Sequence, residues 1–555
     1  MEDKMTTFDD ITNTLWKAAG TFRGVIDAAN YKDFILSMLF IKYLDDMYKE
    51  YIRNLEVRYG DNLVRIERAK KNLPFTLNDN ERFDYLYENR YNSKIGEMIN
   101  TALQGIQDNN TELKGVFRSI NFNSESMLGN PQQKNTRLRT LLEDFKPLCL
   151  EPSKIEIKPN KDPADIIGDA YEYMIGEFAS EAGKKAGSFF TPSMISELMA
   201  RIVKPRINDT IYDPTCGSAS LLIRTARQAE NLDSVAIYGQ EMNGSSWSMA
   251  RMNLFIHDIH VDTGNIAWGD TLSNPQHLDS DGNLKQFDII VANMPFSQDK
   301  WAEGFNPGGQ QEGENADDRK FKMTANLDKY HRFDWGVPPA SKGDWAFLLH
   351  MIYSLRNNGR IAAVVPHGVL FRGASEGMIR KTVVEKNLLD AVIGLPANLF
   401  YGTSIPACIM VLKKNRNIND VLFIDASGKD ENGNLRYKKD KNKNILEMKN
   451  VEDIIKAYEE RKDIEHFAHV ATFDEIKEND FNLNIPRYVD TFEEVDEAYK
   501  KAVENGATSV LEPELEPWGQ RTCYIADPEG NLIEIGSWNK PYEEKDLEGG
   551  KGYGF

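Results

Sequence analysis

The segment Phe287-Asp288-Ile289-Ile290-Val291-Ala292 leads directly into Asn293-Met294-Pro295-Phe296. A short apolar run that ends in a turn with proline predicts a buried strand, and such strands are typical of a sheet covered on both faces. Asn293 would then stand at the carboxyl edge of the sheet, where α/β folds bind their ligands. The stretch therefore predicts the centre of an α/β fold with a functional side chain at its edge.

Similar short strands flank this one and alternate with helical segments. The strand candidates are Thr210–Tyr212, Val235–Gly239, Phe287–Ala292, Arg360–Val365, Leu389–Leu395 and Ala407–Leu412. Their alternation with helices predicts a parallel, doubly wound sheet over residues 161–490. The long irregular connection between Ser297 and Gly343 is either a loop that faces the substrate or an insertion with little structure.

The first part of the chain has a different pattern. Between Leu15 and Leu44, apolar residues recur at a spacing of three to four, which predicts amphipathic helices. We expect residues 1–160 to form a helical domain, whose apolar stripes are either its own core or in part a face for a partner.

Composition restricts the functions that this chain can have. No apolar run is long enough to span a membrane, the N-terminus lacks a signal peptide, and the four cysteines are far apart, so we expect a reduced, cytoplasmic protein without a thiol-ligated metal site. The net charge is −19, and residues 491–555 alone hold fifteen acidic and six basic residues. A chain this acidic repels nucleic acids at long range, so any action on nucleic acid is expected to need a partner that supplies affinity and sequence choice.

Three strand ends carry residues suited to an adenosine-bearing cofactor. The small-residue turn Asp213 to Ala219, with Gly217 and Ser218, lets backbone N–H groups approach a ligand closely. Glu241, at the end of the next strand, can accept both ribose hydroxyls, and Asp270 can meet an adenine amino group. No phosphate-binding lysine follows the first turn, so S-adenosyl-L-methionine fits better than a nucleoside triphosphate.

The turn Asn293 to Phe296 suits an exocyclic amine. The oxygen of Asn293 and the carbonyl of Met294 can accept the two N–H bonds and make the nitrogen more nucleophilic. Pro295 biases Met294 toward an extended conformation. Phe296 can stack on a base swung out of double-stranded DNA. The two sites together predict methyl transfer to a DNA base.

These segments resemble the modification (M) subunit of type I restriction–modification systems, the N-6 adenine DNA methyltransferase family. The resemblance covers residues 10–492 and includes, beyond the stretches above, Leu15–Ala19, Tyr31–Phe34, Gly187–Pro192, Pro366–Arg372, Gly394–Phe400 and Asn482–Tyr488. It implies that Phe189, Phe190, Thr191 and Pro192 line the methionine part of the cofactor. It also implies a separate specificity (S) subunit, with a restriction (R) subunit and a second M subunit as further partners.

Two positions depart from the family pattern. Ala219 stands where glycine is usual, which we interpret as a mild change. Asn293 to Phe296 falls on the family's catalytic motif Asn-Pro-Pro-Phe, in which Met294 replaces the first proline. The restraint of a fixed φ is therefore lost while the carbonyl is kept. We expect reduced preorganisation of the site. We interpret His367, in a Pro-His-Gly turn, as structural rather than as a general base.

The sequence pattern changes again in the last part of the chain. Glu493 to Asn505 predicts a helix, and Ser509–Leu511, Arg521–Ala526 and Leu532–Ile535 predict strands. Residues 491–555 resemble half of a glyoxalase/bleomycin-resistance domain, a small α+β unit of the βαβββ kind. Glu534 falls where that family often places a metal ligand, but the other half is missing, so we expect an inert or dimerising half-module.

Three functions follow from these observations. The first is a site-specific adenine-N6 DNA methyltransferase subunit. The second is an assembly subunit of the same complex that binds cofactor and partner but methylates poorly, suggested by Met294, Ala219 and the foreign tail. The third, a metal-dependent glyoxalase-like enzyme, depends on the tail alone.

Overall fold

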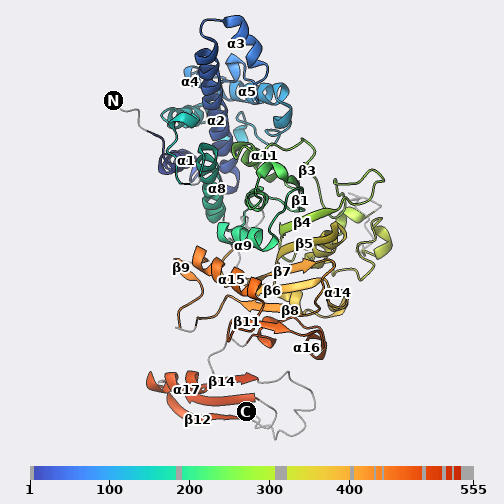
Figure 1. The fold of residues 1–555 in the computed structure, drawn as a ribbon. Coiled ribbons are helices and arrows are strands. Elements are labelled where there is room, and N and C mark those ends of the chain that lie inside the picture. Colours follow the sequence, from blue (N-terminus) through green and yellow to red (C-terminus); the bar gives the residue numbers. More distant parts are fainter. Residues whose placement is uncertain are drawn as a thin grey trace, which may run out of the picture.

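The computed structural model describes residues 5–159, 161–182, 190–306, 322–400, 405–430, 433–440, 443–489, 495–515, 520–527 and 530–538. The predicted parts appear as a helical body, a sheet with helices on both faces, and a small C-terminal sheet (Figure 1). No helix in these ranges combines the length and apolar composition needed to cross a membrane.

The helical body is built on the long helix α2. Its helices are α1 (Phe8–Phe22), α2 (Ala28–Tyr59), α3 (Leu63–Lys70), α4 (Phe83–Glu88), α5 (Ile95–Asn109), α6 (Glu125–Leu128), α7 (Pro131–Phe145) and α8 (Pro163–Ala182). In α1 a capping box of Thr7 and Asp10 starts the helix, and residues one turn apart such as Ile11, Leu15 and Ala18 are buried. Helix α8 shares one apolar core with α1 and α2, so this core continues past residue 160.

The second part is a nine-stranded sheet. Its strands are β1 (Thr210–Asp213), β2 (Ala236–Glu241), β3 (Ile266–Trp268), β4 (Phe287–Asn293), β5 (Leu355–Pro366), β6 (Leu389–Gly394), β7 (Ala407–Lys413), β8 (Val421–Asp425) and β11 (Ala468–Ala471). They lie in the order β11-β8-β6-β7-β5-β4-β1-β2-β3. All six predicted strands are present, so the α/β prediction is confirmed.

The prediction of a wholly parallel sheet was wrong. Strand β7 runs antiparallel to both β5 and β6, and β11 runs antiparallel to β8. The described residues between β6 and β7 contain no helix, and the chain enters the sheet again from the end that it has just left, because the two strands are antiparallel neighbours. The strand pattern alone could not show this, because a strand buried on both faces has the same composition in either direction.

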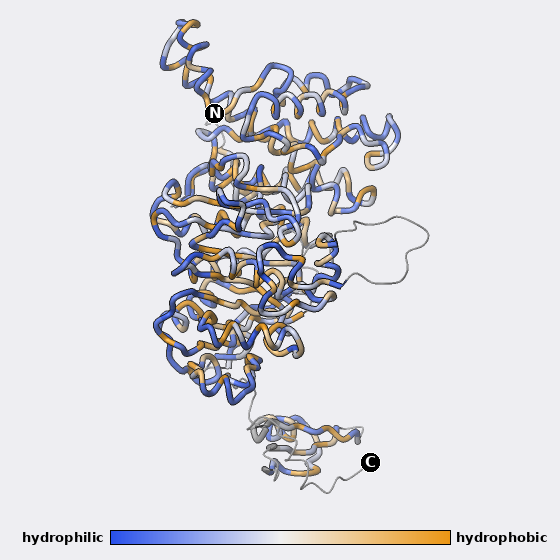
Figure 2. Tube along the Cα trace, turned by 90° about the vertical axis from the view of Figure 1, so that its right-hand side faces the viewer, coloured by the Kyte–Doolittle hydropathy of each residue, from blue (hydrophilic) through white to orange (hydrophobic). Residues whose placement is uncertain are grey.

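Apolar layers cover both faces of the sheet. Along β4, Ile289 and Val291 point into one core and Ile290 and Ala292 into the other. The helices of this part are α9 (Ser193–Val203), α10 (Ser220–Ala226), α11 (Gly244–Ile256), α12 (Asp344–Tyr353), α13 (Gly368–Phe371), α14 (Ala374–Glu385), α15 (Met448–Glu460) and α16 (Phe473–Glu478). Figure 2 shows the apolar segments running through the middle of this body with hydrophilic loops at its margin.

The C-terminal unit has one helix and three antiparallel strands. Helix α17 (Val495–Glu504) packs against β12 (Thr508–Leu515), β13 (Gln520–Ala526) and β14 (Leu532–Trp538). The predicted helix and three strands are thus present, and β13 contributes the buried Cys523 and Ile525. Between β11 and α17 the described residues contain no strand that would open a βαβββ unit. A hairpin of β9 (Lys438–Asp440) and β10 (Lys443–Ile445) lies outside both sheets.

Candidate active site

The site lies where the sheet changes direction. Strands β1 and β4 are parallel neighbours, with Ile211 beside Ile289 and Tyr212 beside Ile290. From β1 the chain continues to β2 and β3 on one side, and from β4 to β5 on the other. Loops that leave two such strands in opposite directions leave a crevice at their carboxyl ends. The turn after β1 and the turn after β4, predicted separately from sequence, therefore meet here.

Asn293 is the last residue of β4, and Thr191 fixes its side chain. The Nδ2 atom of Asn293 donates to Oγ1 of Thr191 at 3.1 Å, across 102 positions of the sequence. With Nδ2 used in this way, Oδ1 points in a different direction within the amide plane. Within the described part of the chain no group donates to Oδ1. The asparagine thus presents a free acceptor at the edge of the sheet.

Met294 and Phe296 of this turn lie against different apolar cores. The side chain of Met294 is only 1% exposed and belongs to the same apolar core as Trp301 and Trp345. Phe296 is partly buried and meets Phe400 edge to face, with ring centroids 5.6 Å apart. The methionine that replaces a proline is therefore a packing residue, a role that its sequence position did not reveal.

A buried carboxylate holds the chain just after this turn. Asp344, at the start of α12, accepts the backbone N–H of Ser297 at 2.7 Å and pairs with Arg372 at 2.5 Å. Arg372 also pairs with Glu376 of α14. Neither Asp344 nor its link to Ser297 was predicted, since the three partners are far apart in sequence. Arg372 lies in the run Pro366–Arg372, which the sequence analysis noted only because it resembles the methyltransferase family.

The turn after β1 is shaped by backbone contacts. Gly217 and Ala219 both have positive φ, +53° and +63°, and the N–H of Gly217 donates to Oε2 of Glu241 at 2.9 Å. Asp213 accepts the N–H of Thr215 at 2.9 Å. Ser218 is buried, and its carbonyl accepts a hydrogen bond from Asn253 of α11. Asp213, Gly217 and Glu241 are thus brought together as predicted, although Ala219 is in a conformation that favours glycine.

Two buried carboxylates give this turn its electrostatic character. Burial, together with the nearby Glu241, raises the pKa of Asp213 to about 8. Burial also raises the pKa of Glu241, against the opposing effect of its backbone hydrogen bonds. Neither carboxylate forms an ion pair with a described residue. Such a site repels an anion and favours a ligand that brings hydroxyl donors or positive charge.

The third carboxylate, Asp270, lies two residues after β3. Its oxygens accept the N–H groups of Leu272 and Ser273, so it also caps the turn that follows. Between Glu241 and Asp270 the surface carries Met242 and Trp268, which are 58% and 49% exposed. The indole N–H of Trp268 donates to the carbonyl of Met242 at 2.9 Å. Sequence reasoning missed this apolar shelf, although large apolar residues directly beside two predicted ligand carboxylates could have suggested it.

Comparison with known proteins identifies the family of the chain. The N-6 DNA Methylase family matches residues 162–497, and the HsdM N-terminal domain matches residues 11–145. The methylase subunit of the type I restriction enzyme MpnII from Mycoplasma pneumoniae is 32% identical, over 92% of this chain and 95% of that protein. The chain belongs to the N-6 DNA methylase family.

Further matches refine this result. The HindI methylase subunit from Haemophilus influenzae is 32% identical over 73% of this chain and 85% of its own length. The type I methyltransferase subunit from Streptococcus thermophilus, a solved structure, is 35% identical with a TM-score of 0.73, covering 88% of this chain and all of that one. Residues 484–535 match the Glyoxalase/Bleomycin resistance protein/Dioxygenase superfamily. This chain is thus a methylase subunit of a type I restriction–modification system and an adenine-specific DNA methyltransferase, with a glyoxalase-like segment at its C-terminus.

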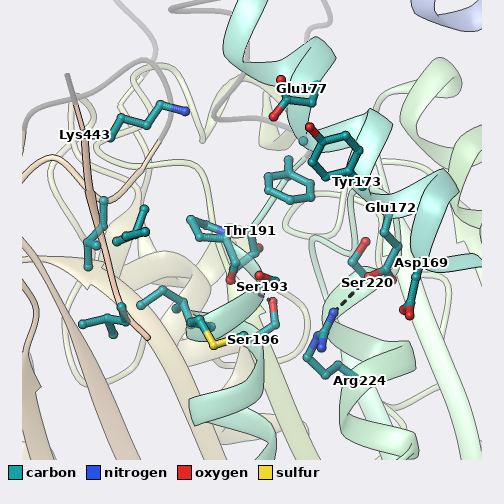
Figure 3. A pocket seen from close by; sticks show the side chains of 18 of the residues that line it. Asp169, Glu172, Tyr173, Glu177, Thr191, Ser193, Ser196, Ser220, Arg224 and Lys443 are labelled. Atoms are coloured by element: carbon teal, nitrogen blue, oxygen red, sulfur yellow. Dashed lines mark hydrogen bonds and ion pairs between the residues drawn. The ribbon is translucent and has the colours of Figure 1, made fainter. Parts of the chain in front are cut away.

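In this methylase two cavities meet at the segment before α9. Thr191 and Ser220 line both a small cavity of about 20 Å³, between the β1 turn and Asn293, and a larger one of about 450 Å³ toward α8. In the larger cavity, Arg224 points to Glu172 (Figure 3). Phe190 lies against Gly176 of α8, and Pro192 precedes α9. Phe189, predicted beside them, lies outside the described residues.

Two histidines of the methylase have structural contacts. Nε2 of His367 lies 3.1 Å from the carbonyl of Ala407, which agrees with its interpretation as a structural residue. His350 lies between Tyr212 of β1 and the buried Arg332, at 3.2 and 3.0 Å. Arg332 forms an ion pair with Asp328 and donates to the carbonyl of Leu272 at 2.6 Å, so the described end of the connection from Ser297 to Gly343 is held against α12 and the loop after β3.

Proposed function

We propose that this methylase transfers the methyl group of S-adenosyl-L-methionine to N6 of an adenine that is swung out of duplex DNA. The observation that carries the proposal is the orientation of Asn293. Its Nδ2 is held by Thr191, so Oδ1 is available to accept a hydrogen bond from the amine. The carbonyl of Met294 accepts the second N–H, and Phe296 stacks on the base.

This arrangement answers the chemical difficulty of the reaction. The lone pair of an exocyclic amine is delocalised into the ring, so the nitrogen is a weak nucleophile. Two acceptors aimed at its hydrogens favour a tetrahedral nitrogen and so stabilise the transition state more than the ground state. The methylated amine is acidic and can lose its proton to solvent, so the reaction requires no general base from the protein. We therefore propose no catalytic role for His367.

The residues at the strand ends fit the cofactor. When bound, S-adenosyl-L-methionine supplies an electrophilic methyl group on a positively charged sulfur. Glu241 would accept the ribose hydroxyls, Asp270 would face the adenine, and Met242 and Trp268 would offer it an apolar surface. Asp213, Gly217 and Ser218, with Thr191 and Pro192, would hold the methionine end. The raised pKa values of Asp213 and Glu241 support this assignment, since a cation relieves their unfavourable burial.

We further propose that a separate specificity subunit chooses the DNA site. The chain carries a net charge of −19, which weakens any affinity for the DNA polyanion. A partner that supplies positive charge and base contacts accounts for how such a chain acts on DNA. A restriction subunit and a second modification subunit belong to the same proposed complex.

The test is modified-base sequencing of DNA from cells that express this chain with its cognate specificity subunit. We expect N6-methyladenine at one defined sequence, and its loss in Asn293→Ala. Thr191→Val keeps the size of the side chain but removes the hydroxyl that orients Asn293, so it should lower methylation without abolishing complex formation. Methylation that persists in Asn293→Ala would contradict the assignment.

A second function is favoured by Met294 and Ala219. If their departures from the family pattern impair the site, the chain serves the complex as an assembly subunit. Cofactor binding by a verified complex, without methylated product, would identify this case. The metal-dependent alternative depends on Glu534, and no group of three or more His, Cys, Asp or Glu side chains in the described ranges could hold a metal ion. Titration with a divalent metal tests this third function directly.

A further inference from the structure

Helix α11 connects the two main bodies of the molecule. Met249, Met252 and Phe255 lie in the core of the helical body, whereas Trp247 and Leu254 lie in a core beside the sheet. Every residue from Ser246 to Ile256 is buried. A helix with apolar contacts on all sides is enclosed by its neighbours, so neither body can shift without moving it.

The first turn of α11 touches the predicted ribose site. The N-cap residue Asn243 donates its backbone N–H to Oε1 of Glu241 at 2.7 Å. Two residues later, the hydroxyl of Ser245 donates to Asp33 at 2.8 Å and accepts from Nζ of Lys32 at 2.8 Å. Lys32 and Asp33 belong to α2, in the segment Tyr31–Phe34 that the sequence analysis singled out and to which the reaction assigns no role. The helical body thus holds the turn that carries a hydrogen-bond partner of Glu241.

A second contact reaches the apolar shelf. The guanidinium of Arg118, from the loop after α5, lies 4.8 Å from the ring centroids of both Trp247 and Trp268. Trp247 is buried in α11, and Trp268 is half-exposed beside Asp270. A cation held against two indole rings fixes their separation and orientation. Arg118 therefore sets the position of the surface proposed to face the adenine.

We propose that the helical body controls the affinity for the cofactor, through Lys32 and Asp33 at Ser245 and through Arg118 at Trp268. These are positioning residues, because they act on Glu241 and on the shelf and do not touch the cofactor themselves. The inference rests on the proposed cofactor site. Linkage makes the effect reciprocal, so that bound cofactor stabilises the packing of residues 112–120 and of α2 against α11.

The experiment uses the full chain in complex with its specificity subunit. Ser245→Ala removes the hydroxyl that joins α11 to α2, Ser245→Thr retains it, and Arg118→Gln removes the stacked cation. Arg139→Gln is the matched control, since Arg139 lies over Tyr91 within the helical body, away from α11. Calorimetry gives Kd for S-adenosyl-L-methionine, steady-state kinetics give kcat at saturating cofactor, and hydrogen exchange gives protection of residues 112–120.

Ser245→Ala and Arg118→Gln should each raise the Kd for the cofactor by about fivefold or more, a typical size for coupling between sites. Ser245→Thr and Arg139→Gln should leave it unchanged, kcat should stay within about twofold, and cofactor should slow exchange in residues 112–120 of the wild type. An unchanged Kd in both variants would overturn the inference, and so would equal weakening in Arg139→Gln. If the wild type itself does not bind the cofactor, the proposed function fails first, and this result is distinguishable from the others.

Discussion

Ala219 occupies a backbone conformation that side chains rarely adopt. Its φ of +63° and ψ of +7° lie in the left-handed region, and the residue is fully buried at the start of α10. The interpretation of this substitution as mild, made from its size alone, did not include this conformation. The methyl group at 219 therefore costs free energy at the turn that would hold the cofactor.

Ala219→Gly should raise the free energy of unfolding by about 1 kcal/mol, because glycine adopts this conformation without steric cost. Urea denaturation of the purified chain measures the change. Ala226→Gly, in the same helix, is the control and should destabilise by about 1 kcal/mol, since glycine is a poor helix former. Equal destabilisation by both changes would show that Ala219 is not strained.

Met294→Pro should have opposite effects on activity and on stability. A proline at 294 restrains the turn, so we expect turnover to rise about tenfold, equivalent to about 1.4 kcal/mol of barrier. It also removes a side chain that is 1% exposed, so the melting temperature should fall. Met294→Leu keeps the packing without the restraint and should leave turnover unchanged. Unchanged turnover in Met294→Pro would mean that preorganisation of the turn does not limit the reaction.

The buried Asp213 predicts how cofactor affinity changes with pH. Its pKa is raised from 3.8 to about 8, and the ionised form suits a cationic ligand. Below pH 8 a proton must leave when the cofactor binds, so the Kd should fall by up to about tenfold per pH unit as pH rises toward 8, and then level off. Calorimetry corrected for the ligand's own titration measures this. Asp213→Asn should bind more weakly and with a flatter profile.

The same group makes the unliganded fold sensitive to pH. Because the folded-state pKa lies above the unfolded value, the folded state binds the proton more tightly. The resulting stabilisation is complete below pH 3.8 and is lost as pH rises through 8. Glu241, with a pKa also raised by burial, acts in the same direction.

At the scale of elements, α12 and α14 restrain the turn that is proposed to be catalytic. Asp344 at the start of α12 accepts the N–H of Ser297 and pairs with Arg372, which pairs in turn with Glu376 of α14. The Asn293–Phe296 turn is therefore restrained from below by the buried Met294 and just after it by a buried carboxylate.

Asp344→Asn should lower kcat more than it changes cofactor affinity. The amide can still accept from Ser297 but no longer carries the charge that holds Arg372, so the turn loses part of its restraint. A displacement of the order of 1 Å at a reacting group can cost about a hundredfold, so we expect kcat to fall tenfold to a hundredfold. Kd for the cofactor should stay within about twofold. An equal loss of kcat and of cofactor affinity would indicate general unfolding, which circular dichroism would detect.

At the scale of the whole molecule, the C-terminal unit differs from the rest. Helix α17 packs on its own three-stranded sheet, and residues 491–555 carry fifteen acidic and six basic residues. We expect a chain that ends at Val489 to keep the main unfolding transition and the cofactor affinity of the full chain. Calorimetry of both chains, with and without cofactor, measures this. Loss of cofactor binding in the shorter chain would assign the tail a role in the site.

The separate domains 1–160, 161–490 and 491–555 remain a proposal. The apolar core of the helical body includes α8 and one side of α11, both beyond residue 160. The first boundary was placed where the sequence pattern changes from helices to strands. A domain boundary depends on which surfaces pack together in space, and the order of helices and strands along the sequence does not show this packing.

The sequence by itself determined the features that depend on local order. A buried strand needs an apolar run, and a turn that binds a ligand at the end of such a strand needs small or polar residues. The six strands, and the positions of Asp213, Glu241 and Asn293 at strand ends, could therefore be predicted from neighbouring residues in the sequence. Three features were decided only by the tertiary structure: the antiparallel direction of β7, the hydrogen bond that turns Asn293, and the double packing of α11. Each arises from contacts between residues far apart in the chain, whose energy depends on a geometry that no local pattern specifies.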